Sequence, residues 1–151
     1  MLQEVSPIIT YGFIATTLLS VALFMKASKF NRLALMAIFG WLGIHGILAG
    51  MGFFLETEIV PPRFILVFIP VFLLFIVLFN IKKGKAWIDS LDPGMLTILH
   101  IVRIPVELIL YGLFLEKAVP ELMTFAGRNF DILAGITAPF IYYFGFVKNQ
   151  L

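Results

Sequence analysis

Three ionisable side chains lie close together in one long apolar segment of the sequence. His100, Arg103 and Glu107 occur within residues 95–115, where most of the other residues are aliphatic or aromatic. At about 100° per residue along a helix, His100, Glu107 and Tyr111 fall within about 40° of one another, and Arg103 lies about 60° to one side. The spacing therefore predicts one polar stripe on a single helix face.

This stripe has two interpretations. Insertion scales put the cost of a charged side chain inside a bilayer at roughly 2.5–3.5 kcal/mol, so such groups face protein or water. One hypothesis is a binding or proton-handling site in which Arg103 holds an anion and Glu107 titrates. The alternative is an Arg103–Glu107 ion pair, four residues apart, that holds a helix bundle together. Pro105 predicts a kink, because it cannot donate to the Ile101 carbonyl and frees that group for another donor.

A second histidine lies in another apolar segment. His45 shares a helix face with Trp41, Ala49 and Gly52, which indicates a packed surface. His45 and Glu107 each stand 12 residues from the predicted cytoplasmic start of their helices, roughly 18 Å at 1.5 Å per residue. They are therefore expected to meet near the middle of the membrane. Such a pair can exchange a proton in a low dielectric, or it can be a structural histidine satisfied by a carboxylate.

Two histidines in a helix bundle also suggest axial haem ligands. His100, however, is expected only about 7–8 Å above the cytoplasmic boundary, which leaves the two histidines offset by about 10 Å. Haem is therefore disfavoured. No metal site is predicted, because the sequence has no ligand-dense motif such as His-Glu-x-x-His and no cysteine. We expect no cofactor.

A polar cluster precedes the last apolar segment. Arg128, Asn129 and Asp131 lie at its predicted outer mouth. One hypothesis is that Asn129 or Asp131 caps the following helix. The alternative is an extracytoplasmic gate or a vestibule for a solute.

Glycines are concentrated in the second apolar segment. Gly46 and Gly50 form a Gly-x-x-x-Gly pair, which lets another helix backbone approach closely. We therefore assign these two residues to helix packing.

The amino-acid composition indicates whether the surface of the chain faces water or lipid. Hydrophobic residues make up 61% of the chain and charged residues 13%, against roughly 45–50% and about 25% in soluble domains. A chain of 151 residues with so few polar groups cannot cover a water-soluble core. The basic residues are dispersed between apolar runs, so they indicate membrane anchors and no nucleic-acid partner. The lipid bilayer is the expected partner.

The apolar runs are long enough to cross a membrane as helices, and backbone groups in hydrocarbon must be satisfied within the segment. Ser6-Pro7 and Asp92-Pro93 each place a capping residue before a proline at a helix start. The prediction is an all-α polytopic transmembrane bundle, with residues 1–151 forming a single transmembrane domain. Its five predicted spans are residues 8–25, 33–55, 64–81, 95–115 and 130–147.

Basic residues predict the orientation of the bundle. Seven fall on one side of the predicted spans, namely Lys26, Lys29, Arg32, Lys82, Lys83, Lys85 and Lys148, and three on the other, namely Arg63, Lys117 and Arg128. The positive-inside rule places the seven in the cytoplasm, with the N-terminus outside and the C-terminus inside. The residues before Pro7 include no Lys or Arg, so we expect the first span to be retained and not cleaved as a signal peptide.

Part of the chain resembles known proteins. The sequence His-Ile-Val-Arg-Ile-Pro-Val-Glu at 100–107 and the sequence Met-Thr-Phe-Ala-Gly-Arg-Asn-Phe-Asp-Ile-Leu-Ala-Gly at 123–135 resemble an uncharacterised family of small multi-pass proteins of bacterial inner membranes. The resemblance covers mostly the C-terminal third and implies an inner-membrane location, with no activity to carry over. Family members extend beyond the position of Leu151, so this chain is either truncated or a shorter relative.

The function hypothesis follows from the polar residues. We expect an inner-membrane protein that binds or transports a small polar or anionic solute through His45, His100, Arg103, Glu107 and Tyr111. The first alternative is a non-catalytic structural or assembly subunit that docks through its glycines. The second is an intramembrane enzyme acting on a lipid-like substrate, with Glu107 or His100 as general base. A homo-oligomer or a membrane-complex partner is compatible with all three.

Overall fold

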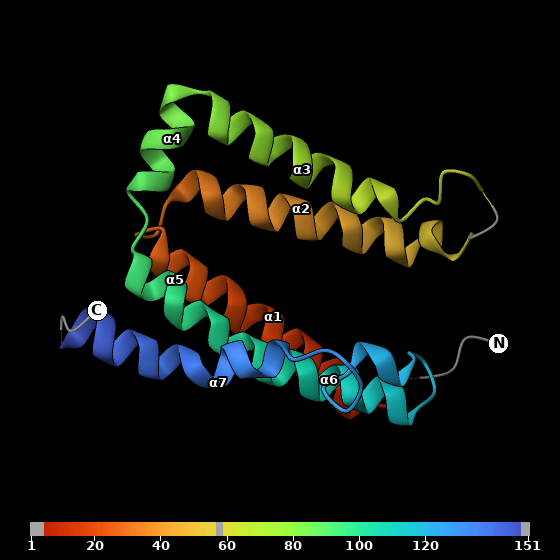
Figure 1. Cartoon of the computed structure of the whole chain (residues 1–151). Helices are drawn as coiled ribbons and strands as arrows, with labels where there is room; N and C mark the ends of the chain where they lie inside the picture. The colour runs from red at the N-terminus through yellow and green to blue at the C-terminus, as the bar shows by residue number, and fades with distance from the viewer. Residues whose placement is uncertain (1–4, 57–58, 149–151) are drawn as a thin grey trace. The chain divides into compact units, whose positions relative to one another are not determined.

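The computed structural model describes residues 5–56 and 59–148, and all regular secondary structure in these residues is helical. The chain forms two compact units. In the described part, the first unit comprises residues 5–29 and 92–148, and the second comprises residues 30–91. The helices of each unit are shown in Figure 1.

In the first unit, α1 (Pro7–Ala27) and α5 (Pro93–Leu99) begin at the predicted serine-proline and aspartate-proline pairs. The Ser6 side chain accepts a hydrogen bond from the Ile8 amide, and the Asp92 side chain accepts one from the Met95 amide at 3.0 Å. The Asp92 amide in turn donates to the Ala27 carbonyl at 2.9 Å. The end of α1 therefore lies beside the start of α5.

The segment that carries the predicted polar stripe is interrupted. A single 3₁₀ turn, η2 (His100–Val102), separates α5 from α6 (Arg103–Leu115). Pro105 is the third residue of α6, a position where the missing amide hydrogen is tolerated. The break in α-helical hydrogen bonding falls directly before the proline, as its ring and missing donor predict.

The last helix, α7 (Asp131–Tyr142), continues into a π-helical turn, η4 (Tyr143–Val147). Its Gly135 is buried, and a Cβ atom at this position would lie 3.2 Å from the His100 carbonyl oxygen. A Cβ atom on Gly94 would lie 3.1 Å from the Tyr142 ring. Helix α7 therefore begins beside α6 and runs back along η2 and α5. At Gly135 the neighbouring atoms include backbone, and at Gly94 they are side chains, so both close approaches depend on the missing Cβ atom.

The second unit contains α2 (Arg32–Gly50), η1 (Phe53–Leu55), α3 (Ile65–Asn80) and α4 (Lys82–Asp89). Helix α2 is shorter than the predicted span at 33–55, because Gly52 has a φ of 72° and ends the helix. Helices α3 and α4 meet at 93°. At the opposite end, Arg63 pairs with Glu56 at 2.7 Å and donates to the Phe53 carbonyl at 3.1 Å, which closes the connection between α2 and α3.

Three helical segments of the described residues are long and apolar enough to cross a membrane: Pro7–Ala27, Arg32–Gly50 and Pro93–Leu115. The number rises to four if α3 and α4 count as one broken span, while Asp131–Val147 is shorter. The large side chains of α3 point outward, with Phe68 64% and Phe72 68% exposed, as expected for a lipid-facing helix. The described part of the chain is thus all-helical with candidate membrane spans, and the five-span count and the orientation remain predictions.

A polar network at the start of the last helix

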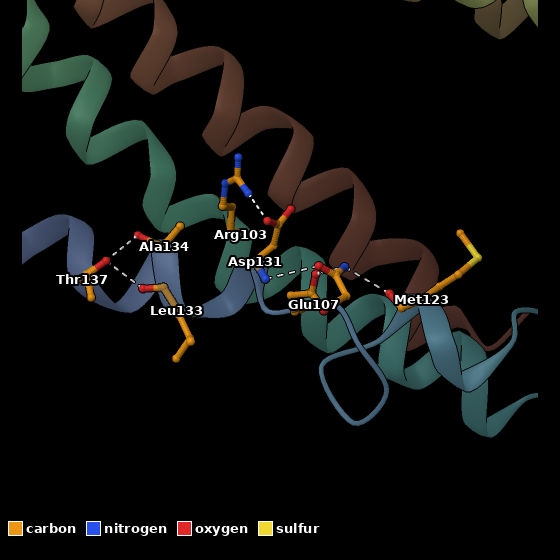
Figure 2. Close-up of polar contacts among 8 residues, drawn as sticks. Arg103, Glu107, Met123, Asp131, Leu133, Ala134 and Thr137 are labelled. Carbon is orange, nitrogen blue, oxygen red and sulfur yellow. Dashed lines mark hydrogen bonds and ion pairs between the residues drawn. The ribbon is translucent and has the colours of Figure 1, made fainter.

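Glu107 is the most deeply buried ionisable side chain among the described residues. It lies on α6 and is 1% exposed. Its Oε1 atom accepts a hydrogen bond from the side-chain amide of Asn129. Asn129 comes from the segment just before α7, so the contact joins parts of the chain that are 22 residues apart. The Glu107 side chain and its dashed contact are shown in Figure 2.

Asn129 holds three segments together. Its side-chain nitrogen also donates to the Met123 carbonyl at 3.1 Å, and its side-chain oxygen accepts from the Asp131 amide at 3.2 Å. Its own amide donates to the Thr124 carbonyl at 3.2 Å. The bond from the first amide of α7 agrees with the capping hypothesis for Asn129, although the N-cap position itself is Phe130, which has no side-chain cap bond.

Arg103 and Glu107 do not form the ion pair that their four-residue spacing suggests. Arg103 instead pairs with Asp131, with Nη1 and Oδ1 2.5 Å apart. The ordinary helical pairing is wrong here because α7 brings Asp131, its first residue, against the first residue of α6. The Arg103 and Asp131 side chains are 36% and 58% exposed, so this ion pair lies at the surface of the unit.

The connection between α6 and α7 is built around a threonine and a glycine. Thr124 is fully buried, and its hydroxyl donates to the Glu121 carbonyl at 2.9 Å. The Gly127 amide donates to the Thr124 carbonyl at 3.0 Å. A Cβ atom on Gly127 would come within 2.9 Å of backbone atoms of Glu121 and Leu122. A larger residue at 127 therefore cannot keep this turn, and the turn places Asn129 beside Glu107.

One carboxylate oxygen of Glu107 accepts no hydrogen bond in the described network. Oε2 is buried and has no hydrogen-bond partner among residues 5–56 and 59–148. The positive charge of Arg103 is taken by Asp131, so an ionised Glu107 would have no paired counter-ion in the described network. An orphan buried oxygen is energetically unfavourable unless a proton, water or ligand satisfies it. This atom is the strongest candidate for a contact with a solute.

The other residues of the predicted stripe surround this network to different degrees. Tyr111 packs against Phe125 of the connecting segment, with ring centroids 5.0 Å apart. His100 begins η2 and is exposed, and Arg128 is exposed beside Asn129. The structure therefore brings Arg103, Glu107, Asn129 and Asp131 into one network, with Tyr111 next to the segment that completes it.

His45 belongs to α2 in the second unit. Its Nδ1 lies 2.9 Å from the Trp41 carbonyl oxygen, and its ring lies 4.0 Å from the Trp41 ring, centroid to centroid. Because a carbonyl can only accept, Nδ1 carries the hydrogen and a neutral imidazole would leave Nε2 as an acceptor. The proposed pairing of His45 with Glu107 stays a prediction.

The predicted packing glycines are open in the structure. A Cβ atom added to Gly46 or Gly50 would meet no atom within 4 Å in the described part of the chain. The packing of another helix against these two glycines therefore remains a prediction.

The sequence pattern does not single out Thr124 or Gly127 as site residues. Neither lies on a helix with a periodic pattern, and their role depends on a turn formed by residues 121–129. The one available signal was the Gly-Arg-Asn sequence at 127–129, since glycine and asparagine are typical turn residues.

Comparisons with protein-family models, curated proteins and solved structures found no match. The resemblance to small bacterial inner-membrane proteins thus stays a prediction. The residues that the structure describes include no group of three side chains suited to hold a metal ion, and the expected lack of a cofactor is likewise untested.

Proposed function

We propose that this chain is a multi-pass protein of the bacterial inner membrane that binds or passes a small polar solute at the network of Arg103, Glu107, Asn129 and Asp131. The observation that carries the proposal is the buried Glu107 Oε2 atom without a partner. Ionisable groups inside membrane segments are rare because they are costly, and they mark binding or transport sites. The non-helical segment around Asn129 supports the proposal, because irregular backbone at membrane depth is tolerated beside protein or a water-filled cavity.

The charges of the network limit the class of solute that can bind. Arg103 was the residue expected to hold an anion, but it is engaged by Asp131. An anion would therefore have to displace the Asp131 carboxylate, whereas a hydrogen-bond donor meets the free Glu107 oxygen directly. A solute that donates hydrogen bonds or carries a positive charge is favoured over an anionic one.

The proposal is tested by a thermal-stability screen of the detergent-purified protein against amines, neutral polar solutes, carboxylates and inorganic ions. A solute that binds the folded state raises the melting temperature by mass action, corresponding to about 2.7 kcal/mol at 100 times its dissociation constant. The shift should disappear in Glu107→Gln, which replaces the free acceptor by a donor of the same shape. Glu121→Gln is the matched control, because Glu121 is exposed and lies in the same connecting segment.

If no solute stabilises the wild type while Glu107→Gln is plainly less stable, Glu107 is a structural residue and the binding proposal fails. A solute that stabilises both proteins equally binds elsewhere and also counts against it.

A second candidate is an assembly subunit, favoured by the open glycine face of α2. Close helix packing at such a face needs small residues. In this case Gly46→Leu would abolish association with a second copy or a partner in detergent, measured by size-exclusion chromatography with light scattering. The solute-binding proposal predicts no effect of this variant on the solute-induced stability shift.

A further inference from the structure

The connecting segment Glu116–Phe130 turns back into the unit. Glu107, which contacts Asn129, lies eight residues before the end of α6 at Leu115, about 12 Å at the helical rise of 1.5 Å per residue. Arg103, which contacts Asp131, lies one turn deeper. The outer reference level is set by Glu116, whose carboxylate accepts from the Ser6 amide at 3.2 Å, at the first turn of α1. Helix α7 thus begins well below the level at which α1 begins and α6 ends.

The helices beside this segment are apolar up to that level. Ile8, Tyr11 and Phe13 near the start of α1 are 83%, 71% and 63% exposed, and Leu108 and Leu115 of α6 are 56% and 64% exposed. These exposed apolar side chains belong in lipid. The residues near 129 therefore lie inside the membrane, and the connection is re-entrant.

Charged groups in this segment and at the first residue of α7 are exposed. Arg128 is exposed and the Asp131 side chain is 58% exposed. Charged side chains at this depth are placed toward water or protein, because contact with hydrocarbon is costly. Water from the side of Glu116 has the shorter distance to cross, because Glu107 lies eight residues from Leu115 and 14 residues from Pro93.

The network also has an unbalanced charge. Arg103 and Asp131 neutralise one another, Asn129 is neutral, and Glu107 adds one negative charge when ionised. A single uncompensated charge with a buried free oxygen matches a ligand with one positive charge.

We infer that the re-entrant segment Glu116–Phe130 admits a small monovalent cation from the aqueous side at Glu116 to the free oxygen of Glu107. This inference rests on the proposed function and adds the solute class and the side of entry. The cation would replace the missing counter-ion, and Asn129 would keep the other carboxylate oxygen in place.

The route is tested with single cysteines, because the natural sequence contains none. Lys117→Cys marks the end of the unit, Arg128→Cys probes the re-entrant segment, and Phe72→Cys is the lipid-facing control in the middle of α3. A membrane-impermeant maleimide is applied to intact cells and, separately, to inverted vesicles. We expect Lys117→Cys and Arg128→Cys to react from the same side and Phe72→Cys to remain unlabelled from both. Labelling of Arg128→Cys only from the opposite side, or from neither, overturns the route.

The solute class is tested by melting curves of the full chain in sodium, potassium, ammonium and choline chloride at equal ionic strength. At least one small cation should raise the melting temperature saturably relative to choline, and Glu107→Gln should lose this difference while Glu121→Gln keeps it. No difference between any small cation and choline overturns the cation assignment. If a neutral polar solute stabilises wild type and not Glu107→Gln, the proposed function holds and only the solute class is wrong. If nothing stabilises the wild type, both fail.

Discussion

At the scale of single residues, the site depends on which polar side chains form hydrogen bonds with one another. Asn129 gives both amide hydrogens to oxygens of the network and accepts one from the start of α7. Glu107 uses one oxygen in this network and keeps the other free. Buried polar groups stabilise a fold only while their partners are present. Asn129 therefore supports both the fold of the connecting segment and the position of the Glu107 carboxylate.

The Asn129→Ala variant should be clearly less stable, because it leaves the Glu107 Oε1 atom, the Met123 carbonyl and the Asp131 amide without their partner. Only the contact with Glu107 is withdrawn from water, and a buried group left unsatisfied costs about 1–3 kcal/mol, whereas water can replace the two exposed contacts. Chemical denaturation in detergent micelles would measure the loss. The matched control is Asn80→Ala, whose side chain donates to the Ile76 carbonyl at an exposed position, where a change within about 0.5 kcal/mol is expected. Equal losses in both variants would contradict a special role for Asn129.

The ion pair of Arg103 can be identified by double-mutant cycles. Arg103→Gln combined with Asp131→Asn should show a coupling energy of about 0.2–1 kcal/mol, as expected for a partly exposed ion pair. The cycle of Arg103→Gln with Glu107→Gln should show a smaller coupling, because Glu107 bonds to Asn129. The two coupling energies are measured by equilibrium unfolding, and the larger one identifies whether Asp131 or Glu107 is the partner of Arg103. A larger coupling with Glu107 would contradict the pairing of Arg103 with Asp131.

At the scale of elements, the connection between α6 and α7 matters more than either helix. Its buried Thr124 and its Gly127 fold residues 121–129 into a turn that fills the space beside α6. Gly135 then lets the start of α7 lie against the backbone of η2 and α6. Helix α7 therefore begins beside the start of α6, and not at the level where α6 ends, as a complete fifth span would.

Gly127→Ala should destabilise the first unit. The added Cβ atom would meet the backbone of Glu121 and Leu122, which cannot move away as a flexible side chain can. Overpacking of this kind costs typically 1–3 kcal/mol. Gly43→Ala in α2 is the control, because its added Cβ atom meets no described atom within 4 Å. Melting temperatures of both variants should differ, with Gly43→Ala at or above the wild-type value. An unchanged Gly127→Ala protein would contradict the described turn.

At the scale of the whole molecule, the first unit has two distinct ends. Ser6 and Glu116 lie at one end, while Ala27 and Asp92 meet at the other. Helix α7 ends beside Gly94, so Lys148 belongs to the same end as Lys26 and Lys29. The connecting segment followed by α7 thus leads the chain to the same end as a complete fifth span would.

The two ends of the chain should accordingly lie on opposite sides of the membrane. Reporter fusions at the N-terminus and the C-terminus, one active only in the cytoplasm and one only outside it, would measure this topology. The basic residues at the α1, α5 and α7 end predict a cytoplasmic C-terminus. Termini on the same side would contradict both the orientation and the re-entrant reading.

The sequence by itself determined the helical class, the apolar helices long enough to cross a membrane and most helix starts, because these depend on local properties. Hydrocarbon requires internally bonded helices, and the Ser6-Pro7 and Asp92-Pro93 pairs begin helices through neighbouring atoms. Only the tertiary structure decided the partners in the polar network. Periodicity placed Arg103 and Glu107 on one helix face, but it contains no information on residues 22 or more positions away. Asn129 and Asp131 became their partners because Gly127 and Gly135 allow the chain to fold back tightly against α6.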